Sequence, residues 1–466
     1  LEAFAVAVIM ALVIKHFCVE AFKIPTGSMV PTLYGDNYDP DRDGDRILVD
    51  KWAYLFADPG RWDIPVFRYP LDRSRNFIKR IVGLPGEHMR IHAGDIWTKR
   101  AGSDDEFEIA RKPARVRDQL FFPVYPPAVE EDAGGDDAAL REELQDTWNI
   151  QGPEGAWRLA NHARYEFLGG PEATLVTRHA IHADSDEWDW PRPYYSRDVV
   201  RDVRVRATVT RGPPRPAGLD ADEPDRVTFT WKPDGLWETV LVLSTKEHES
   251  FAILRRDGGD LETVPLGAAL APKGSLDVVL EYVDGDMRVS IDGTERCVVP
   301  DRRRIDEDTG RSGQALEIRA VGSPYAITDL RIDRDLYYEN KFAYRSEWQR
   351  DGIEIPEGAY FMLGDNTSQS SDSRKWRIRT LHLRDGTSIQ YDDGPGHGPD
   401  WLDGGMKEVV DVDGVTRRWH EDDEDPDRGG GADNAPFVWR ELIVGRAFLV
   451  FWPLAPEFPG RLRFIH

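Results

Sequence analysis

The sequence predicts a mainly β protein that starts with a transmembrane helix and continues as a β domain interrupted by an inserted antiparallel β-sandwich. Three observations predict this fold class. Residues 3–14 are all apolar. Most of the later chain consists of short runs of β-forming residues, many of them alternating, bounded by Gly, Asp and Pro, as in strands and turns. No long stretch of residues 23–99 has the 3.6-residue period of an amphipathic helix.

Length and composition limit the class of protein. A chain of 466 residues with 40% hydrophobic and 11% aromatic residues is long enough, and apolar enough, for two or three packed domains. The formal charge of −24 argues against nucleic acid as a partner, because backbone phosphates would be repelled. The two cysteines, Cys18 and Cys297, lie far apart and exclude a disulfide framework.

The apolar N-terminal segment is expected to be a retained membrane anchor over residues 1–22. A bilayer core needs about 20 residues of helix, and this length is reached if Lys15 and His16 extend toward an interface. A cleaved signal peptide is the alternative. It is disfavoured because no basic region precedes the apolar run and because KIPTGSM, rather than a small-residue cleavage site, follows it.

Two groups of predicted strands follow the anchor. ILVDKWAY, FIKRIVGL and HMRIHAGDIWT read as strands of a first domain. Residues 101–146 read as a loop rich in acidic residues, with a short exposed helix in EEDAGGDDAALREEL. Six or more alternating strands between 148 and 335 predict an antiparallel sandwich. Its strongest local signal is VDGD between LDVVLEY and MRVSIDG, which predicts a hairpin.

The first domain is expected to resume after the sandwich. YFMLGDN reads as a strand, residues 393–435 as a second acidic, Gly-rich loop, and ELIVGRAFLVFWP as a buried closing strand. A long insertion between two strands is tolerated because loop-closure entropy grows slowly with length. The predicted domains are the anchor at 1–22, a catalytic domain at 23–100 and 341–466, and the insert at 101–340.

Three separated segments carry residues whose side chains could take part in catalysis. In Lys23–Leu33, the residues Pro25, Gly27 and Pro31 impose an irregular backbone around Ser28. In FIKRIVGLPGE, strand alternation would place Lys79 beside the side chains of Phe77 and Ile81. Desolvation there would lower the lysine pKa toward about 7, so that the amine could accept a proton. A surface lysine on an edge strand is the alternative for this segment alone.

The third segment is GDNTSQSSDSR, residues 364–374. Alone it reads as a polar turn, and its two carboxylates, Asp365 and Asp372, are too few for an EF-hand. The three segments together resemble the bacterial type I signal peptidase family in their order, their spacing and the identity of their residues. That family has a membrane segment, a PSGSMxPTL-like loop, a YIKRxxGLPGD-like strand and a GDN…S.DSR loop, and VGRAFLVFWP is similar to its last strand. The resemblance covers residues 23–100, 341–380 and 436–466.

The resemblance implies a serine endopeptidase with no cofactor and no metal. It makes Ser28 the nucleophile and Lys79 the general base, a variant of the serine–histidine–aspartate arrangement. Thr26 matches the oxyanion-hole serine, and Ser370 matches the residue that orients the lysine. The resemblance also implies a supporting ion pair, Asp372 with Arg374. The positions that would line shallow substrate pockets for small residues, the Ala-X-Ala rule, are Ile24, Pro25, Met29, Leu33, Phe77 and Ile78.

Two departures from the family pattern stand out. Thr367 occupies a position where the family usually has Arg, and the large insert is absent from the short members. The insert resembles, more weakly, concanavalin-like or laminin G-like sandwiches. Its aromatic run EWDWPRPYY, with Trp188, Trp190, Tyr194 and Tyr195, suits either sugar stacking or a packed loop.

By this resemblance the partners are preprotein signal peptides and membrane lipid, with an envelope protein or a glycan as candidate ligand of the insert. The expected location is the cytoplasmic membrane, with the catalytic domain on its outer side. Two alternatives remain open. A self-cleaving repressor with a Ser–Lys pair would need a DNA-binding head in place of the anchor. A membrane-tethered binding protein would use the sandwich on an inactive peptidase scaffold.

Overall fold

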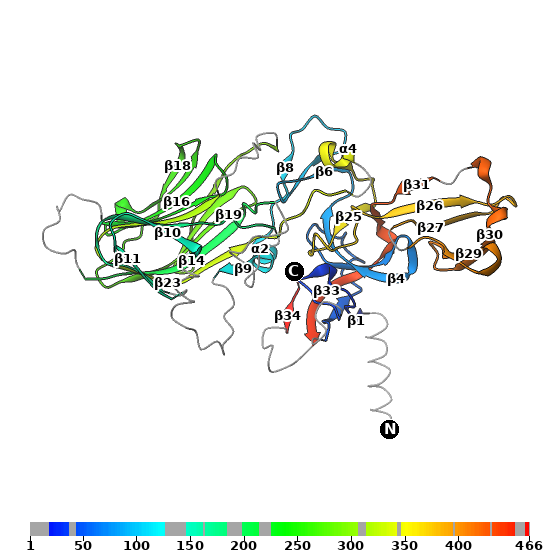
Figure 1. Cartoon of the computed structure of the whole chain (residues 1–466), viewed down its shortest axis with the longest axis horizontal. Helices are drawn as coiled ribbons and strands as arrows, with labels where there is room; N and C mark the ends of the chain where they lie inside the picture. The colour runs from blue at the N-terminus through cyan, green and yellow to red at the C-terminus, as the bar shows by residue number, and fades with distance from the viewer. Residues whose placement is uncertain are drawn as a thin grey trace, which may run out of the picture. The chain divides into compact units, whose positions relative to one another are not determined.

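The chain divides into two compact units in the computed structural model. Unit 1 is Leu1–Gln119 with Tyr338–His466, and unit 2 is Leu120–Tyr337. Figure 1 shows that both consist mainly of strands. The described residues contain two short α-helices, α2 (Ala114–Leu120) and α4 (Ser346–Asp351). The residues that the structure describes are 18–36, 43–125, 146–161, 164–183, 198–213, 225–305, 314–342, 346–394, 397–428, 431–452 and 462–465.

The expected transmembrane helix over residues 1–22 is wrong. Val19–Lys23 form strand β1, which pairs antiparallel with β2 (Arg46–Asp50). Backbone groups that bond to a neighbouring strand are not available for a membrane-spanning helix, which satisfies its groups internally. Across the described part of the chain, no helix has both the length and the apolar character to cross a bilayer. The apolar run before residue 18 lies outside the described residues.

Two sheets of unit 1 carry the nucleophile and lysine segments. A six-stranded sheet has the order β1-β2-β33-β3-β4, with β34 on β33, and a three-stranded sheet has the order β32-β25-β5. FIKRIVGL, expected to be one strand, is divided between them, with Lys79 at the break. The further strands are β3 (Pro65–Tyr69), β4 (Asp72–Ile78), β5 (Arg80–Gly83), β25 (Ala359–Leu363), β32 (Phe437–Trp439), β33 (Ile443–Trp452) and β34 (Arg463–Phe464).

The remaining strands of unit 1 form three small sheets. Two of them take four strands from the described part of 393–435, so the expectation of a single loop there is wrong. A separate apolar cluster that includes Tyr391, Val409 and Trp419 supports these strands, although their sequence is mostly polar. The strands are β24 (Ile353–Glu354), β6 (Glu87–His92), β7 (Asp95–Arg100) and β8 (Glu108–Ile109); β27 (Ser388–Asp392), β26 (Arg377–His382) and β31 (Ala432–Asn434); and β28 (Asp400–Trp401), β29 (Met406–Val410) and β30 (Thr416–His420).

Unit 2 consists of two antiparallel sheets. One has the order β10-β13-β22-β15-β16-β17-β18, and the other β11-β12-β23-β14-β19-β20-β21 with β9 on β23. The seven strands of the first are β10 (Trp148–Gln151), β13 (Gly170–Thr177), β22 (Ala315–Gly322), β15 (Arg226–Lys232), β16 (Trp237–Ser244), β17 (Phe251–Arg256) and β18 (Gly259–Pro265). The eight of the second are β9 (Phe122–Tyr125), β11 (Trp157–Asn161), β12 (Arg164–Phe167), β23 (Tyr325–Arg334), β14 (Val203–Arg211), β19 (Ser275–Val283), β20 (Asp286–Ile291) and β21 (Thr294–Pro300).

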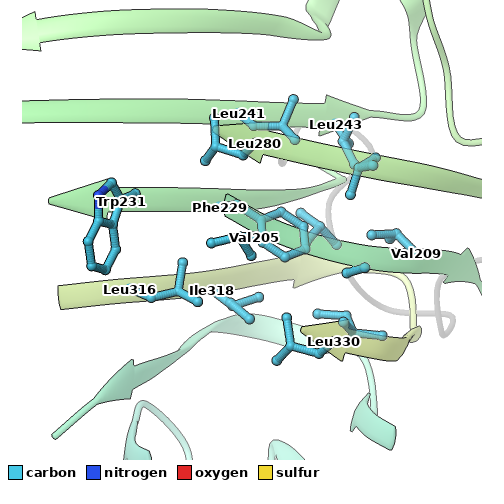
Figure 2. Close-up of a cluster of buried hydrophobic side chains, with 14 of the residues drawn as sticks. Val205, Val209, Phe229, Trp231, Leu241, Leu243, Leu280, Leu316, Ile318 and Leu330 are labelled. Carbon is cyan, nitrogen blue, oxygen red and sulfur yellow. The ribbon is translucent and has the colours of Figure 1, made fainter. Parts of the chain in front are cut away.

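The two sheets of unit 2 share one apolar core. Figure 2 shows Phe229 and Ile318 of the first sheet among Val205 and Leu280 of the second. The hairpin expected at VDGD is present between β19 and β20. Its turn residues Asp284 and Gly285 both have positive φ, as a two-residue type I′ turn requires.

Three other expectations meet the structure less directly. The short helix expected in EEDAGGDDAALREEL and the aromatic run EWDWPRPYY both lie outside the described residues. Helix α2 lies in the stretch expected to be a loop. Both cysteines are free.

Candidate active site

Ser28 lies on a short turn that the core of unit 1 holds in place. The turn is the 3-10 helix η2 (Gly27–Met29), which follows β1. Met29 and Leu33 are fully buried in the core of the six-stranded sheet, and the Leu33 amide donates to the Met29 carbonyl at 2.8 Å. These anchors leave Ser28 half-buried, with its hydroxyl available for contact.

Lys79 approaches this hydroxyl from the break between β4 and β5. Its Nζ donates a hydrogen bond to Ser28 Oγ at 2.6 Å, although the two residues are 51 positions apart. The side chain lies near the Phe77 ring, with Nζ 5.6 Å from the ring centroid. Lys79 is 3% exposed. A buried ammonium loses its hydration, so the neutral amine is favoured.

The pKa of Lys79 is correspondingly lowered, from 10.5 to about 8. Desolvation is the largest cause, and the carboxylates of Asp372 and Asp365 oppose it by favouring the charged form. The sequence predicted the direction and the cause of this shift. At a pKa of about 8, about a tenth of the amine is neutral at pH 7 and can take a proton from a hydroxyl.

Thr26 lies beside Ser28 on the solvent side. Its side chain is exposed, and its Oγ1 donates to Ser28 Oγ at 3.4 Å. A hydroxyl in this place can donate to a negatively charged oxygen that forms next to Ser28. This is the chemistry expected of an oxyanion-hole residue.

The 364–374 loop packs directly against the nucleophile turn. A Cβ placed on Gly364 would lie 2.1 Å from Ser370 Oγ and 2.4 Å from the Ser28 carbonyl oxygen, so only glycine fits there. Ser370 is fully buried, and its hydroxyl has no hydrogen-bond partner within the described part of the chain. The structure therefore brings Ser370 to the site, without the hydrogen bond to the lysine that its predicted orienting role would require.

Asp372 and Arg374 form a buried ion pair that closes this loop. Their closest oxygen–nitrogen distance is 2.7 Å, and Arg374 also donates to the backbone carbonyls of Thr367 and Glu339 at 2.7 and 2.9 Å. Burial opposes ionisation of Asp372, but the Arg374 guanidinium outweighs it and holds the pKa of Asp372 below its ordinary value. A backbone carbonyl at Thr367 serves as a bracing acceptor whichever side chain stands there.

The residues expected to line substrate pockets differ in exposure. Pro25 is exposed and Phe77 is half-buried. Ile24, Met29, Leu33 and Ile78 are buried and belong to the apolar core of the six-stranded sheet. In this structure Pro25 and Phe77 therefore offer surface to a substrate, whereas the other four shape the site from beneath.

Two groups at the site were missed in the sequence. Arg80 and Asp365 form a fully buried ion pair, with nitrogen–oxygen distances of 2.8 and 3.0 Å. Asn366 donates from its amide side chain to the Gly27 carbonyl at 3.0 Å, and from its backbone to the Ser28 carbonyl at 3.1 Å. Arg80 directly follows Lys79, and Asp365 and Asn366 directly follow Gly364, so their positions in the motifs were a signal. Their partners lie too far away in sequence to be identified without a structure.

Comparison with known proteins shows which family the chain resembles. The family model "Signal peptidase, peptidase S26" matches residues 1–122 and 284–387. Signal peptidase I of Pseudomonas fluorescens is 42% identical over 202 residues, which cover 41% of this chain and 62% of that protein. A probable signal peptidase I-2 of Synechocystis sp. is 32% identical over 197 residues, covering 40% of this chain and 81% of that protein.

The chain belongs to the signal peptidase family, peptidase S26. This confirms the class of enzyme predicted from the sequence, a serine peptidase. The chain nevertheless spans only 33% of the Pseudomonas aeruginosa signal peptidase I, with 42% identity over 101 residues, and 62% of the Pseudomonas fluorescens enzyme.

Two solved structures also match the chain. A carbohydrate-binding module, CBM66 from Bacillus subtilis, matches with a TM-score of 0.26 and 7% identity over 40% of this chain and 93% of its own. The basic winged bean lectin matches with a TM-score of 0.28 and 12% identity over 40% of this chain and 92% of its own.

Proposed function

We propose that this protein removes N-terminal signal peptides from exported preproteins, with Ser28 as nucleophile and Lys79 as general base. The observation that carries the proposal is the 2.6 Å hydrogen bond between Lys79 Nζ and Ser28 Oγ, made by a lysine whose pKa burial lowers to about 8. The similarity of the chain to the signal peptidases named above supports the choice of substrate.

The proposed reaction uses residues of unit 1 alone. The neutral Lys79 amine takes the proton of Ser28 as Oγ attacks the carbonyl carbon of the scissile bond. The Thr26 hydroxyl and the Ser28 backbone N–H donate to the oxyanion. The Lys79 ammonium then gives its proton to the leaving amine, which releases the mature protein. Lys79 next activates a water that hydrolyses the acyl-enzyme and frees the signal peptide.

The proposed specificity is cleavage after small residues of the Ala-X-Ala type. The site of action is the outer side of the cytoplasmic membrane, where signal peptides of exported proteins emerge. The exposed Pro25 and the half-buried Phe77 supply apolar surface near Ser28 for such a substrate. Contact with membrane lipid, and a ligand of the insert such as an envelope protein or a glycan, stay predictions.

The test is cleavage of a preprotein with an Ala-X-Ala site by the purified chain. Ser28→Ala and Lys79→Met should each abolish cleavage, because each residue performs a step that the other cannot. Thr26→Ala should lower kcat by about 10²–10³, the usual loss for one oxyanion donor, and Thr26→Ser should retain activity.

Matched controls are Ser103→Ala and Lys51→Met, which change the same residue types away from Ser28. Ser103 is half-buried, and Lys51 pairs with Glu20 at 3.2 Å near the surface. Both should cleave normally. Activity within tenfold of the wild type in Ser28→Ala or Lys79→Met would refute the Ser–Lys assignment, and would favour the alternative in which the insert is the working part.

A further inference from the structure

The outer face of the seven-stranded sheet of unit 2 is hollowed into a groove that no catalytic residue shares. Its volume is about 490 Å³, within the range of about 300–1,000 Å³ that ligand sites occupy. Side chains alternate across each strand, so Phe229 and Trp231 of β15 enter the core while Thr228, Thr230 and Lys232 face the groove. Residues of β15, β16, β17, β18 and β22 line this sheet groove.

The floor of the sheet groove is apolar. Val240, Val242 and Ile253 form a small cluster of their own, with Phe251 packed against it. Val240 lies opposite Ile253, and Val242 opposite Phe251, in the pairing of β16 with β17. The neighbouring Leu241 and Leu243 of β16 belong instead to the core between the sheets. Apolar residues on the outer face of a sheet form a surface that a partner of matching character can cover.

Hydroxyl groups flank this floor on both sides. Thr230 and Thr228 of β15 lie opposite Val240 and Val242, and Thr263 of β18 lies opposite Ile253. Each hydroxyl can both donate and accept a hydrogen bond. An apolar strip between two rows of such groups suits a ligand with an apolar face and a hydroxylated rim.

One end of the sheet groove is closed by charges that neutralise one another. Lys232, Glu238, Arg255 and Asp260 alternate in sign across four strands. Arg255 Nε lies 2.5 Å from Asp260, and Lys232 Nζ lies 2.6 Å from Glu317. With Glu317 included, this end holds two cations and three carboxylates, so it offers both donors and acceptors but no excess positive charge for an acidic ligand.

The opposite end carries two guanidinium groups, Arg226 and Arg319, whose ion pairs with described residues are absent or long. Arg226 forms no ion pair with any described residue. Arg319 is 46% exposed at its side chain, and its nearest carboxylate oxygens, on Glu172 and Glu317, are 3.7 and 3.9 Å away. Arg319 lies opposite Thr228, so the two arginines are diagonal neighbours on one face. In a chain with a formal charge of −24, this cationic end is a local exception.

We propose that the sheet groove binds an acidic oligosaccharide, a chain of sugar rings that carry carboxylates. A pyranose ring presents C–H groups on its faces, which the valine and isoleucine floor would cover, and hydroxyls at its rim, which the threonines and paired charges would bond. A carboxylate matches the fork of an arginine guanidinium. An extended peptide lying across the groove fits less well, because the backbone groups of β15, β16 and β17 beneath it are already paired within the sheet, and strand addition would use the edge strand β18 rather than the groove.

The experiment measures binding of tetragalacturonate and tetramannuronate to the full chain by titration calorimetry, with cellotetraose as the neutral probe and tetraglutamate as the acidic peptide. At least one uronate tetramer should bind, more weakly as salt rises. Arg226→Ala and Arg319→Ala should each weaken that binding about tenfold or more, the scale expected for a charge-assisted hydrogen bond. Arg331→Ala is the matched control, since Arg331 is exposed on β23 of the other sheet.

Each other outcome would overturn the proposal. If neither uronate binds, or if Arg331→Ala weakens binding as much as the groove variants, the sheet groove is not the site. Equal binding of cellotetraose would contradict the need for a carboxylate, and equal binding of tetraglutamate would indicate a peptide ligand. Thermal melts of all three variants show whether unit 2 is still folded, and Thr228→Val, which keeps the shape of the side chain, should also weaken binding.

Discussion

The Asn366 side chain donates a hydrogen bond to the backbone carbonyl of Gly27 at 3.0 Å, from a loop more than 300 residues further along the chain. The backbone N–H of Asn366 donates to the next carbonyl, that of Ser28, at 3.1 Å. The carbonyl of Asn366 in turn accepts the Ser370 amide at 2.8 Å. Asn366 therefore ties the nucleophile turn to the loop that carries Ser370.

Asn366→Ala should lower kcat by about 10- to 100-fold with little change in KM, because the nucleophile loses alignment while the exposed binding surface remains. Asn366→Asp should be no better, since a carboxylate cannot donate to the Gly27 carbonyl. Steady-state kinetics on an Ala-X-Ala peptide separates the two parameters, with Asn149→Ala in unit 2 as control. A change in KM alone would mean that Asn366 contacts substrate instead.

Activity should rise with pH through about 8, the pKa of Lys79, and level off above it. Below this pH the ammonium has no free electron pair to accept the Ser28 proton, so kcat/KM should fall about tenfold per pH unit. The profile should be recorded on a peptide that lacks titratable groups near the scissile bond. A plateau that continues down to pH 6 would exclude Lys79 as the general base.

Lys79→Met should raise the melting temperature of unit 1 at pH 7. The folded-state pKa of Lys79 is about 8, against 10.5 for an unburied lysine. Between pH 8 and pH 10.5 the unfolded chain binds more protons than the folded chain, so the free energy of unfolding rises with pH. Below about pH 8 Lys79 is charged in both states, so the full cost of burying the charge is present. Removing the amine removes that cost.

The stability gain from Lys79→Met should therefore shrink as pH approaches 10.5. Calorimetric melts at pH 7 and pH 10 measure it, and Lys51→Met, at a partly exposed ion pair, serves as control. A gain that does not depend on pH would point to apolar packing by methionine rather than to the buried charge.

Gly364→Ala should reduce kcat by more than about 10²-fold, because the added Cβ would displace either Ser370 or the backbone of Ser28. Gly398→Ala is the matched control, since a Cβ there meets nothing within 4 Å. Kinetics and a thermal melt are measured on both variants. Wild-type kcat in a folded Gly364→Ala variant would show that the loop can move away without affecting the nucleophile.

Replacing Leu120–Tyr337 with a short Gly/Ser linker should leave a folded enzyme that still cleaves an Ala-X-Ala peptide. Ser28, Lys79, Thr26 and Ser370 all belong to unit 1, and domains inserted at a surface are commonly removable. Peptide cleavage by the deletion variant is compared with that by the full chain. A folded variant that cannot cleave the short peptide would mean that the insert completes the active site.

The sequence by itself singled out Ser28 and Lys79 and predicted some of the local structures. The roles of these two residues were predicted from motifs, because the residue types and their order are written in the chain, and those roles stay predictions. The β19–β20 hairpin was predictable because its turn needs positive φ at two adjacent residues, and Asp284 and Gly285 tolerate it. The lowered pKa of Lys79 was predictable in direction, because the apolar residues Phe77 and Ile81 lie two positions to either side of it.

Only the tertiary structure decided how distant segments meet. Val19–Lys23 became a strand because β2 was available to pair with it. FIKRIVGL became two strands because its halves bond to different sheets, which turns Lys79 toward Ser28. The Arg80–Asp365 pair and the Asn366–Gly27 bond join residues hundreds of positions apart. Such contacts depend on long-range packing, which local propensity and periodicity do not encode.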